Sequence, residues 1–185
     1  MKAKITEALV KEHRLILRMI DLLEKHAELT ATGKFSNWQF YLDGVDFIRN
    51  YADRFHHAKE EEILFDSLIA NGMPRANSPV AAMLMEHDQG RLYVRGMEEA
   101  AQKALAGEPG QETVITQHAS GYIQLLREHI AKEDEILYPL AERVIPEAAR
   151  DSIIDGYAAA EGKTPVDFTA HYEALVTQYE NELQG

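Results

Sequence analysis

The chain has 185 residues, and its 31 acidic against 19 basic side chains give a formal net charge of -12, which disfavours nucleic acid and anionic membranes as partners. A hydrophobic content of 45% is ample for a buried core, and the absence of cysteine excludes disulfides, thiolate zinc sites and protein-held iron–sulfur clusters. No apolar run reaches the roughly 18 residues of a membrane span, and the first residues are already amphipathic. We therefore expect a soluble cytoplasmic protein without a signal peptide.

The first part of the chain predicts two long helices joined by a turn. Apolar residues recur at helical spacing over residues 3–29, and residues 30–36 break the pattern. Ser36 followed by Gln39 predicts a capping box, from which a second helix runs over residues 37–70.

A second pair of helices is predicted to follow. Gly72 is typical of a helix stop, Ser78 of a helix cap and Pro79 of a first helical turn. The third helix then covers residues 79–106, and after a short turn the fourth covers residues 112–143.

Proline marks the last part of the chain. Pro139 is expected to bend or end the fourth helix, and two shorter helices are predicted over residues 146–160 and 164–183. We predict an all-α fold, an up-down-up-down four-helix bundle of two pseudo-repeated hairpins over residues 1–145. Residues 146–185 form a C-terminal helical extension that serves as a lid, a brace or a surface for homo-oligomerisation.

One ten-residue stretch occurs twice in the chain. It reads HHAKEEEILF at residues 56–65 and HIAKEDEILY at residues 129–138. An alignment without gaps matches one histidine and one glutamate of each copy, His56 with His129 and Glu60 with Glu133. Residues four apart lie on one face of a helix, so each copy directs an imidazole and a carboxylate to the same place. Each copy is therefore a candidate half of a metal site.

Each hairpin also carries a further histidine on its first helix, preceded in both cases by a glutamate. The interval from His13 to His56 is 43 residues, and that from His87 to His129 is 42. Helix packing does not require this agreement, so it favours a metal centre. The predicted ligands are His13, His56, Glu60, His87, His129 and Glu133.

Imidazoles and carboxylates suit iron, manganese and zinc. We expect each of two ions to take the two histidines of one hairpin, while Glu60 and Glu133 bridge between the ions. Two bridging carboxylates with several histidines fit a redox di-iron centre best, so we rank two iron ions ahead of zinc or manganese. Six protein ligands leave coordination positions open for dioxygen, peroxide or another small molecule.

These motifs resemble those of hemerythrin-like proteins of the HHE cation-binding family. The resemblance covers residues 1–145 through the EH pair of the first helix, HHAKEEEILF, MEHDQGR and HIAKEDEILYP. It implies a four-helix bundle with a non-haem di-iron centre, used in that family for reversible dioxygen binding, for sensing oxygen or iron, or for redox defence. It also implies the same six ligands. Dioxygen carriers have a second histidine four residues from the one on the third helix, whereas here Met83 and Arg91 occupy those positions.

Other polar residues near the motifs receive supporting roles. On a regular helix His57 points about 100° away from His56, so we expect it to face solvent or to support a ligand from outside. About 16 Å of helix separates His118 from His129, too far for both to bind one ion on an undistorted helix. Tyr122 shares their face, in a channel or packed in the core. Four acidic residues beside the bridging glutamates are expected on a solvated face, where one can orient a ligand histidine: Glu61, Glu62, Asp134 and Glu135.

The leading functional prediction is a binding protein, a di-iron bundle that binds dioxygen or a related small ligand, or that senses oxygen, iron or redox state. The alternatives are a di-iron oxidase or peroxidase, an iron-handling protein whose metal is cargo, and a bundle that uses these groups only for packing. The last ranks lowest because six inward ionisable groups without a metal would be costly to desolvate. No nucleophile triad, phosphate loop or dinucleotide fingerprint supports a hydrolase, kinase or dehydrogenase. The sequence leaves open whether the protein is an enzyme.

Overall fold

The computed structural model describes residues 4–184, which form helices and connecting turns with no strand among them. The prediction of an all-α protein is confirmed. The first helix, α1, covers Glu7–Ala31, and its predicted start at residue 3 lies outside the described residues. None of the described helices is long and apolar enough to cross a membrane.

The second long helical segment changes type along its length. It stays helical from Trp38 to Ala70, in agreement with the predicted extent. Its parts, in order, are α2 (Trp38–Phe47), the π-helical η1 (Ile48–His57), the π-helical η2 (Glu60–Phe65) and α3 (Asp66–Ala70). The sequence pattern did not predict the π-helical stretches.

The remaining bundle helices follow a turn over residues 71–78. The Ser78 side chain accepts a hydrogen bond from the backbone N–H of Ala81 at 3.3 Å, which confirms it as a helix cap. The elements that follow are α4 (Pro79–Leu105), α5 (Gln111–Lys132), the π-helical η3 (Glu133–Leu137) and α6 (Tyr138–Val144).

One local prediction is wrong, and one alternative of another is excluded. Asn37, not Ser36, is the residue at the start of α2, and Gln39 donates its side-chain hydrogen bond to Asp43 at 2.7 Å instead of closing a capping box. Pro139 does not end the fourth helix, because the chain stays helical to Val144, close to the predicted end at residue 143. The expected bend at Pro139 stays a prediction. The π-helical η3 ends at Leu137, two residues before Pro139, and alters the ladder of backbone bonds just ahead of the proline, so helical structure continues through it.

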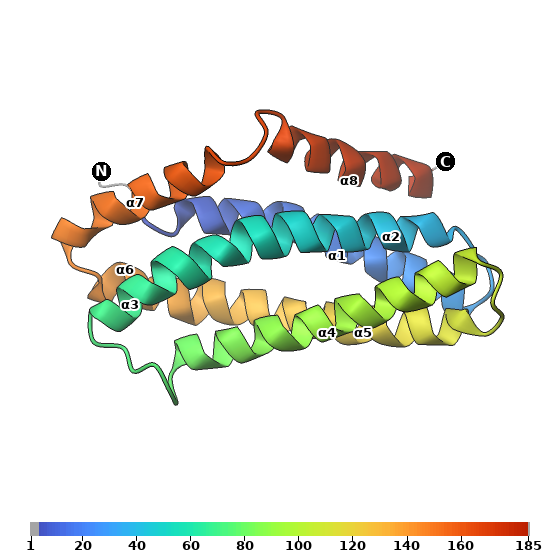
Figure 1. Ribbon diagram of the computed structural model, residues 1–185, viewed down its shortest axis with the longest axis horizontal. Helices are drawn as coiled ribbons and strands as arrows, with labels where there is room; N and C mark the ends of the chain where they lie inside the picture. Colours follow the sequence, from blue (N-terminus) through green and yellow to red (C-terminus); the bar gives the residue numbers. More distant parts are fainter. Residues whose placement is uncertain (1–3, 185) are drawn as a thin grey trace.

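The long helices pack side by side, with α4 along α5, α1 along α5, and α2 against α4 (Figure 1). Their apolar side chains form two separate clusters, one around Met19, Phe47 and Met97 and the other around Leu64 and Leu137. Each long helix passes from one cluster to the other through a buried polar stretch. The polar residues therefore lie in a band between two apolar cores.

The C-terminal residues form α7 (Glu147–Glu161) and α8 (Phe168–Gln184), which run along one side of the bundle (Figure 1). Helix α8 buries Tyr172, Val176 and Tyr179 in the same cluster as the bundle helices. This packing is compatible with a brace, one of the three expected roles, and none of the three is tested. Oligomerisation through the extension and a boundary at residue 145 remain predictions.

Candidate metal centre

The repeated motifs lie where the helices become π-helical. His56 and His57 end η1, while Glu60 and Glu133 begin η2 and η3. A π-helical turn closes i→i+5 bonds and is wider than an α-helical turn, so successive side chains are rotated by less than the about 100° of an α-helix. In this geometry His56 and His57 both point into the bundle, and both are buried.

Four histidines meet in two pairs, and each pair comes from one hairpin as predicted. The Nε2 atoms of His13 and His56 lie 3.0 Å apart, and those of His87 and His129 lie 3.1 Å apart. Two nitrogens about 2.1 Å from one ion, at about 90° to each other, are separated by about 3 Å. The spacing within each pair therefore suits a shared ion.

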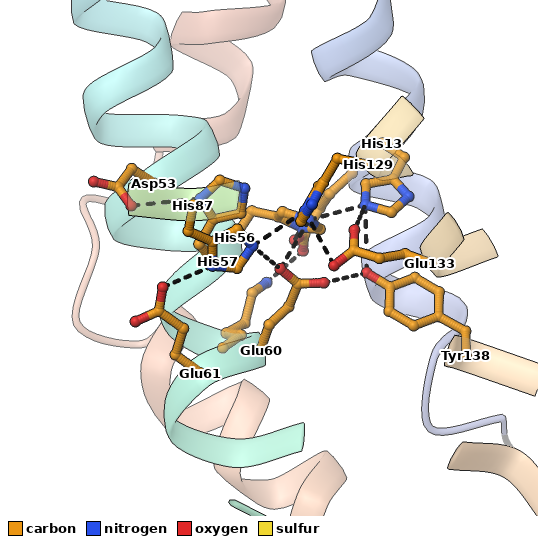
Figure 2. Close-up of polar contacts among 12 residues, drawn as sticks. His13, Asp53, His56, His57, Glu60, Glu61, His87, His129, Glu133 and Tyr138 are labelled. Carbon is orange, nitrogen blue, oxygen red and sulfur yellow. Dashed lines mark hydrogen bonds and ion pairs between the residues drawn. The ribbon is translucent and has the colours of Figure 1, made fainter. Parts of the chain in front are cut away.

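Both glutamates reach both histidine pairs. One carboxylate oxygen of Glu60, Oε2, lies 3.7 Å from Nε2 of His56 and 3.5 Å from Nε2 of His87. The two oxygens of Glu133 lie 3.3 Å from Nε2 of His13 and 3.1 Å from Nε2 of His129. A position between the two pairs is the one that a bridging carboxylate requires (Figure 2).

The donor atoms fall into two compact sets, and within each set they lie within 4.8 Å of one another. One set consists of His13, His56, Glu60 and Glu133, and the other of His57, Glu60, His87 and His129. Oε2 of Glu60 and both carboxylate oxygens of Glu133 are buried without a hydrogen-bond partner. Buried carboxylate oxygens without a hydrogen-bond partner are costly, and a cation between them would remove that cost. The residues therefore fit a bound metal.

Each paired histidine is oriented by a carboxylate on its other ring nitrogen. Nδ1 of each ring lies 2.7 to 2.9 Å from a carboxylate oxygen. The pairs are His13 with Asp134, His56 with Glu12, His87 with Glu61, and His129 with Glu86. A proton held on Nδ1 leaves Nε2 with its lone pair directed inward, which is the tautomer that binds a metal.

These orienting carboxylates repeat in the same way as the ligands. The two on α1 and α4 are the glutamates that precede His13 and His87, and the other two directly follow Glu60 and Glu133. Two of the four residues expected on a solvated face, Glu61 and Asp134, therefore orient histidines, whereas Glu62 and Glu135 are exposed.

Matching lysines of the two motifs extend the network outward. Lys59 donates a hydrogen bond to Glu12, and Lys132 donates one to Glu86. Lys59 is fully buried, 3.8 Å above the ring of Phe55, and it also donates to Glu161 of α7 at 3.0 Å. Burial raises the pKa of Glu12, and the contact with Lys59 opposes this.

The pKa values of the two glutamates are shifted in opposite directions. Burial and the neighbouring negative charge of Glu133 raise the pKa of Glu60, which also accepts a hydrogen bond from the Tyr138 hydroxyl at 2.5 Å. Burial acts to raise the pKa of Glu133 as well, but its contacts with His129 and His13 outweigh burial and lower it. The pKa of Glu60 is therefore raised while that of Glu133 is lowered.

The pKa values of the histidines are also shifted in opposite directions. Burial lowers the pKa of His13, but hydrogen bonding to Asp134 and Glu133 outweighs this and raises the pKa to about 9. Burial dominates for His56 and His57, whose pKa values are lowered. His13 therefore carries a proton that a metal ion would have to displace.

Of the two positions expected for His57, the one facing solvent is wrong. It does not face solvent: its ring is buried and stacks on His87 with centroids 3.8 Å apart, and Nδ1 lies 3.4 Å from Oδ1 of Asp53 (Figure 2). A fifth histidine therefore joins the centre from η1, although α4 lacks one beside His87. The sequence signal was the HH pair, which occurs only in the first copy of the motif.

Tyr138 is a further residue at the centre that the pattern did not single out. Besides Glu60, its hydroxyl contacts Nε2 of His13 at 3.3 Å (Figure 2). Tyr138 ends the second copy of the motif at the position where the first copy has Phe65. This difference between the copies was the available signal.

A cavity of about 230 Å³ opens beside one half of the centre. Its wall includes His57, His87 and His129 but neither His13 nor His56. Tyr122 lines the cavity and also packs in the apolar core, so it fits both of its expected positions. His118 belongs to neither donor set, and its ring instead lies 6.3 Å from that of Tyr93.

The fold and the two donor sets define a helical-bundle protein able to hold metal cations. A family model for the hemerythrin HHE cation-binding domain matches residues 4–141. The chain belongs to this family.

Three mycobacterial proteins are similar to the chain over 139 residues at 21% identity. They are uncharacterized protein Mb2018 of Mycobacterium bovis and uncharacterized proteins MT2051 and Rv1995 of Mycobacterium tuberculosis. The match covers 75% of this chain and 54% of each relative, so the chain spans about half the length of these relatives. The comparison with solved structures found no match.

Proposed function

We propose that the protein holds two iron ions between its helices and binds dioxygen or a related small ligand there, as a carrier or as a sensor of oxygen, iron or redox state. The observation that carries the proposal is the placement of Glu60 and Glu133 between two histidine pairs whose nitrogens are 3.0 and 3.1 Å apart. The proposed ligands are the six predicted residues, together with His57. The two hairpins are proposed to follow the up-down-up-down order of a four-helix bundle.

Bound iron would supply a reversible change of oxidation state and open coordination positions. The protein's own groups would fix and insulate such ions. Four carboxylates hold the histidine rings in their metal-binding tautomer, and apolar clusters lie on both sides of the polar band. Nitrogen and carboxylate donors without any thiolate favour iron over softer metals, with manganese and zinc as the other candidates.

A di-iron oxidase or peroxidase is the second candidate function. It is favoured by the Tyr138 hydroxyl, which donates a hydrogen bond to Oε1 of Glu60 at 2.5 Å and so places an O–H group beside the centre. An iron-handling role, with the metal as cargo, fits less well, because buried donors fixed by outer carboxylates suit a resident metal. A cytoplasmic location remains a prediction.

The test is metal analysis of protein from iron-supplemented cells, with absorption spectra recorded reduced, in air and after peroxide addition. Two irons per chain and charge-transfer bands that reverse when oxygen is removed would support a carrier or sensor. Continuing peroxide consumption would favour the enzyme. Zinc alone, or no metal, would contradict the proposal.

A further inference from the structure

A lysine fixes the carboxylate behind His56. One oxygen of Glu12, Oε2, lies 2.9 Å from Nδ1 of this histidine, and the other oxygen, Oε1, accepts a hydrogen bond from Nζ of Lys59. The carboxylate is thus held from both sides, and its orientation toward the ring depends on where the ammonium group lies. The second motif repeats this arrangement with three other residues: Lys132, Glu86 and His129.

The two lysines differ in their surroundings. The Lys59 side chain is fully buried, whereas that of Lys132 is 39% exposed. Nζ of Lys59 lies 3.8 Å from the centre of the Phe55 ring and donates a second hydrogen bond to Oε1 of Glu161 at 3.0 Å. Among the described residues, Lys132 pairs with Glu86 alone. The two halves of the centre therefore differ in whether a second carboxylate holds the lysine.

Glu161 comes from outside the family domain. It is the last residue of α7, whereas the family model matches residues 4–141. Helix α7 packs on η2, the helix that begins with Glu60 (Figure 1). The Glu161 side chain is half-exposed, and its carboxylate reaches the buried ammonium from the surface. The C-terminal extension therefore contributes a side chain to the network behind a ligand histidine.

The second carboxylate has two physical effects on this half of the centre. A buried ammonium group needs anionic partners, and Glu161 shares Lys59 with Glu12, so that Lys59 draws less strongly on the charge of the orienting carboxylate. The charge of Glu161 also offsets part of the positive charge of Lys59, which by itself opposes a cation at the centre. Both effects favour metal binding at His56.

We propose that Glu161 is a positioning residue for the metal site at His13 and His56: through Lys59 it fixes Glu12 on His56, and it raises the metal affinity of this half alone. The inference rests on the proposed function, because it requires a metal at the centre. It adds the C-terminal extension to the metal-binding machinery. Because linked equilibria are reciprocal, a bound metal should in turn strengthen the contact of α7 with the bundle.

The first test is stepwise iron(II) titration of the metal-free protein without oxygen, which resolves the two sites. Glu161→Gln keeps the size of the side chain and removes its charge. One site should become about two- to fivefold weaker, the range expected for a half-exposed ion pair, and the other should stay unchanged. Asp155→Asn, which removes an exposed carboxylate from the same helix, is the matched control and should change neither site.

A double-mutant cycle tests the path through the lysine. Lys59→Met keeps most of the volume and removes the ammonium group. If Glu161 acts through Lys59, adding Glu161→Gln to the Lys59→Met protein should change neither affinity further, whereas an effect of long-range charge alone would persist. Lys132→Met is the matched background, because Lys132 does not contact Glu161, and there Glu161→Gln should keep its full effect.

Hydrogen exchange tests the reciprocal effect, and it decides the question even if Lys59→Met does not fold. In the wild type, iron(II) loading should slow exchange of the backbone amides at the end of α7, residues 158–161, about two- to fivefold. In Glu161→Gln this slowing should disappear. A side chain that only stabilised the fold would not make exchange in α7 depend on the metal.

The outcomes separate this inference from the proposed function. Wild-type affinity at both sites in Glu161→Gln, equal weakening of both sites, or the same loss in Asp155→Asn would each overturn the inference and leave the metal centre standing. An effect of Glu161→Gln that persists in the Lys59→Met protein, or exchange in α7 that does not respond to iron(II), would also overturn it. Wild-type protein that takes up no iron would overturn the proposed function, and the inference with it.

Discussion

His57 stacks on His87 with ring centroids 3.8 Å apart and ring planes 13° from parallel. The two residues come from different hairpins, so this contact joins η1 to α4 directly at the centre. The corresponding position of the second motif, Ile130, is packed in the apolar core instead. One stacked ring thus breaks the symmetry of a repeated site.

Replacing His57 with the residue of the other motif should weaken one of the two metal sites. His57→Ile removes a donor of the His87 set and leaves the His13 set complete. We expect stepwise iron(II) titration of the metal-free protein to show one site as in the wild type and one at least tenfold weaker. His171→Ile, a change at an exposed histidine, is the control. Two unchanged affinities would exclude His57 as a ligand.

Removing the charge of either shared glutamate should empty the centre. Glu60→Gln and Glu133→Gln keep the shape of the side chain but lose the anion that faces both histidine pairs. We expect most bound metal to be lost, and the melting temperature to stop responding to metal addition, because metal binding is linked to folding. Glu62→Gln, at the exposed end of the same acidic run, should behave as wild type. A Glu60→Gln protein with two metals per chain would rule out the bridging role.

The orienting carboxylates should matter for affinity without being ligands. Glu12→Gln and Glu86→Gln weaken the acceptors for Nδ1 of His56 and His129. Loss of such a partner typically costs about 10- to 100-fold in metal affinity. Competition with a chelator of known affinity measures the change, and Glu135→Gln, an exposed neighbour of Glu133, serves as control. Equal affinities in all three variants would contradict an orienting role.

Metal binding should release a proton from His13. Its folded pKa of about 9 is raised above the usual 6.5, so protonated His13 stabilises the metal-free fold below pH 6.5, and this contribution is lost as pH rises to about 9. Because the metal needs the neutral ring, the apparent affinity should rise with pH over the same interval, by up to about tenfold per unit. A pH indicator in weak buffer at pH 7.5 would report the release. Asp134→Asn, which removes one cause of the raised pKa, should lessen the pH dependence, and a flat profile in the wild type would contradict the assignment.

The C-terminal extension should stabilise the whole bundle. Tyr172 of α8 is buried against Phe47 with ring centroids 5.6 Å apart, and its hydroxyl donates to Asp46 at 3.0 Å. Truncating a buried aromatic side chain costs about 3 to 5 kcal/mol, so Tyr172→Ala should lower the free energy of unfolding by about 3 kcal/mol. Urea unfolding of the metal-free protein measures it, with the exposed Asn181→Ala as reference. A change below about 0.5 kcal/mol would show that the extension is not part of the cooperative fold.

The sequence alone determined the helical class and the candidate ligands. Apolar residues at helical spacing predicted the long helices, and the repeat of HxxxE with a matched lone histidine singled out the six residues that the fold brings together. These signals are local: the i, i+4 spacing places His56 and Glu60 on one face whatever surrounds them. The glutamates before His13 and His87 were visible in the same pattern, although their role as acceptors was not.

Only the tertiary structure decided how the halves differ. The inward turn of His57 depends on a π-helical stretch, and the positions of Tyr138 and of the cavity depend on packing between helices far apart in the sequence. An inference from apolar periodicity takes each helix by itself and as regular. It therefore predicts the face on which a residue lies, but not the helix that packs against this face. The contacts that Glu161 and Phe168 make beside the His56 side of the centre likewise depend on how α7 and α8 pack against the bundle. Local spacing does not determine this packing.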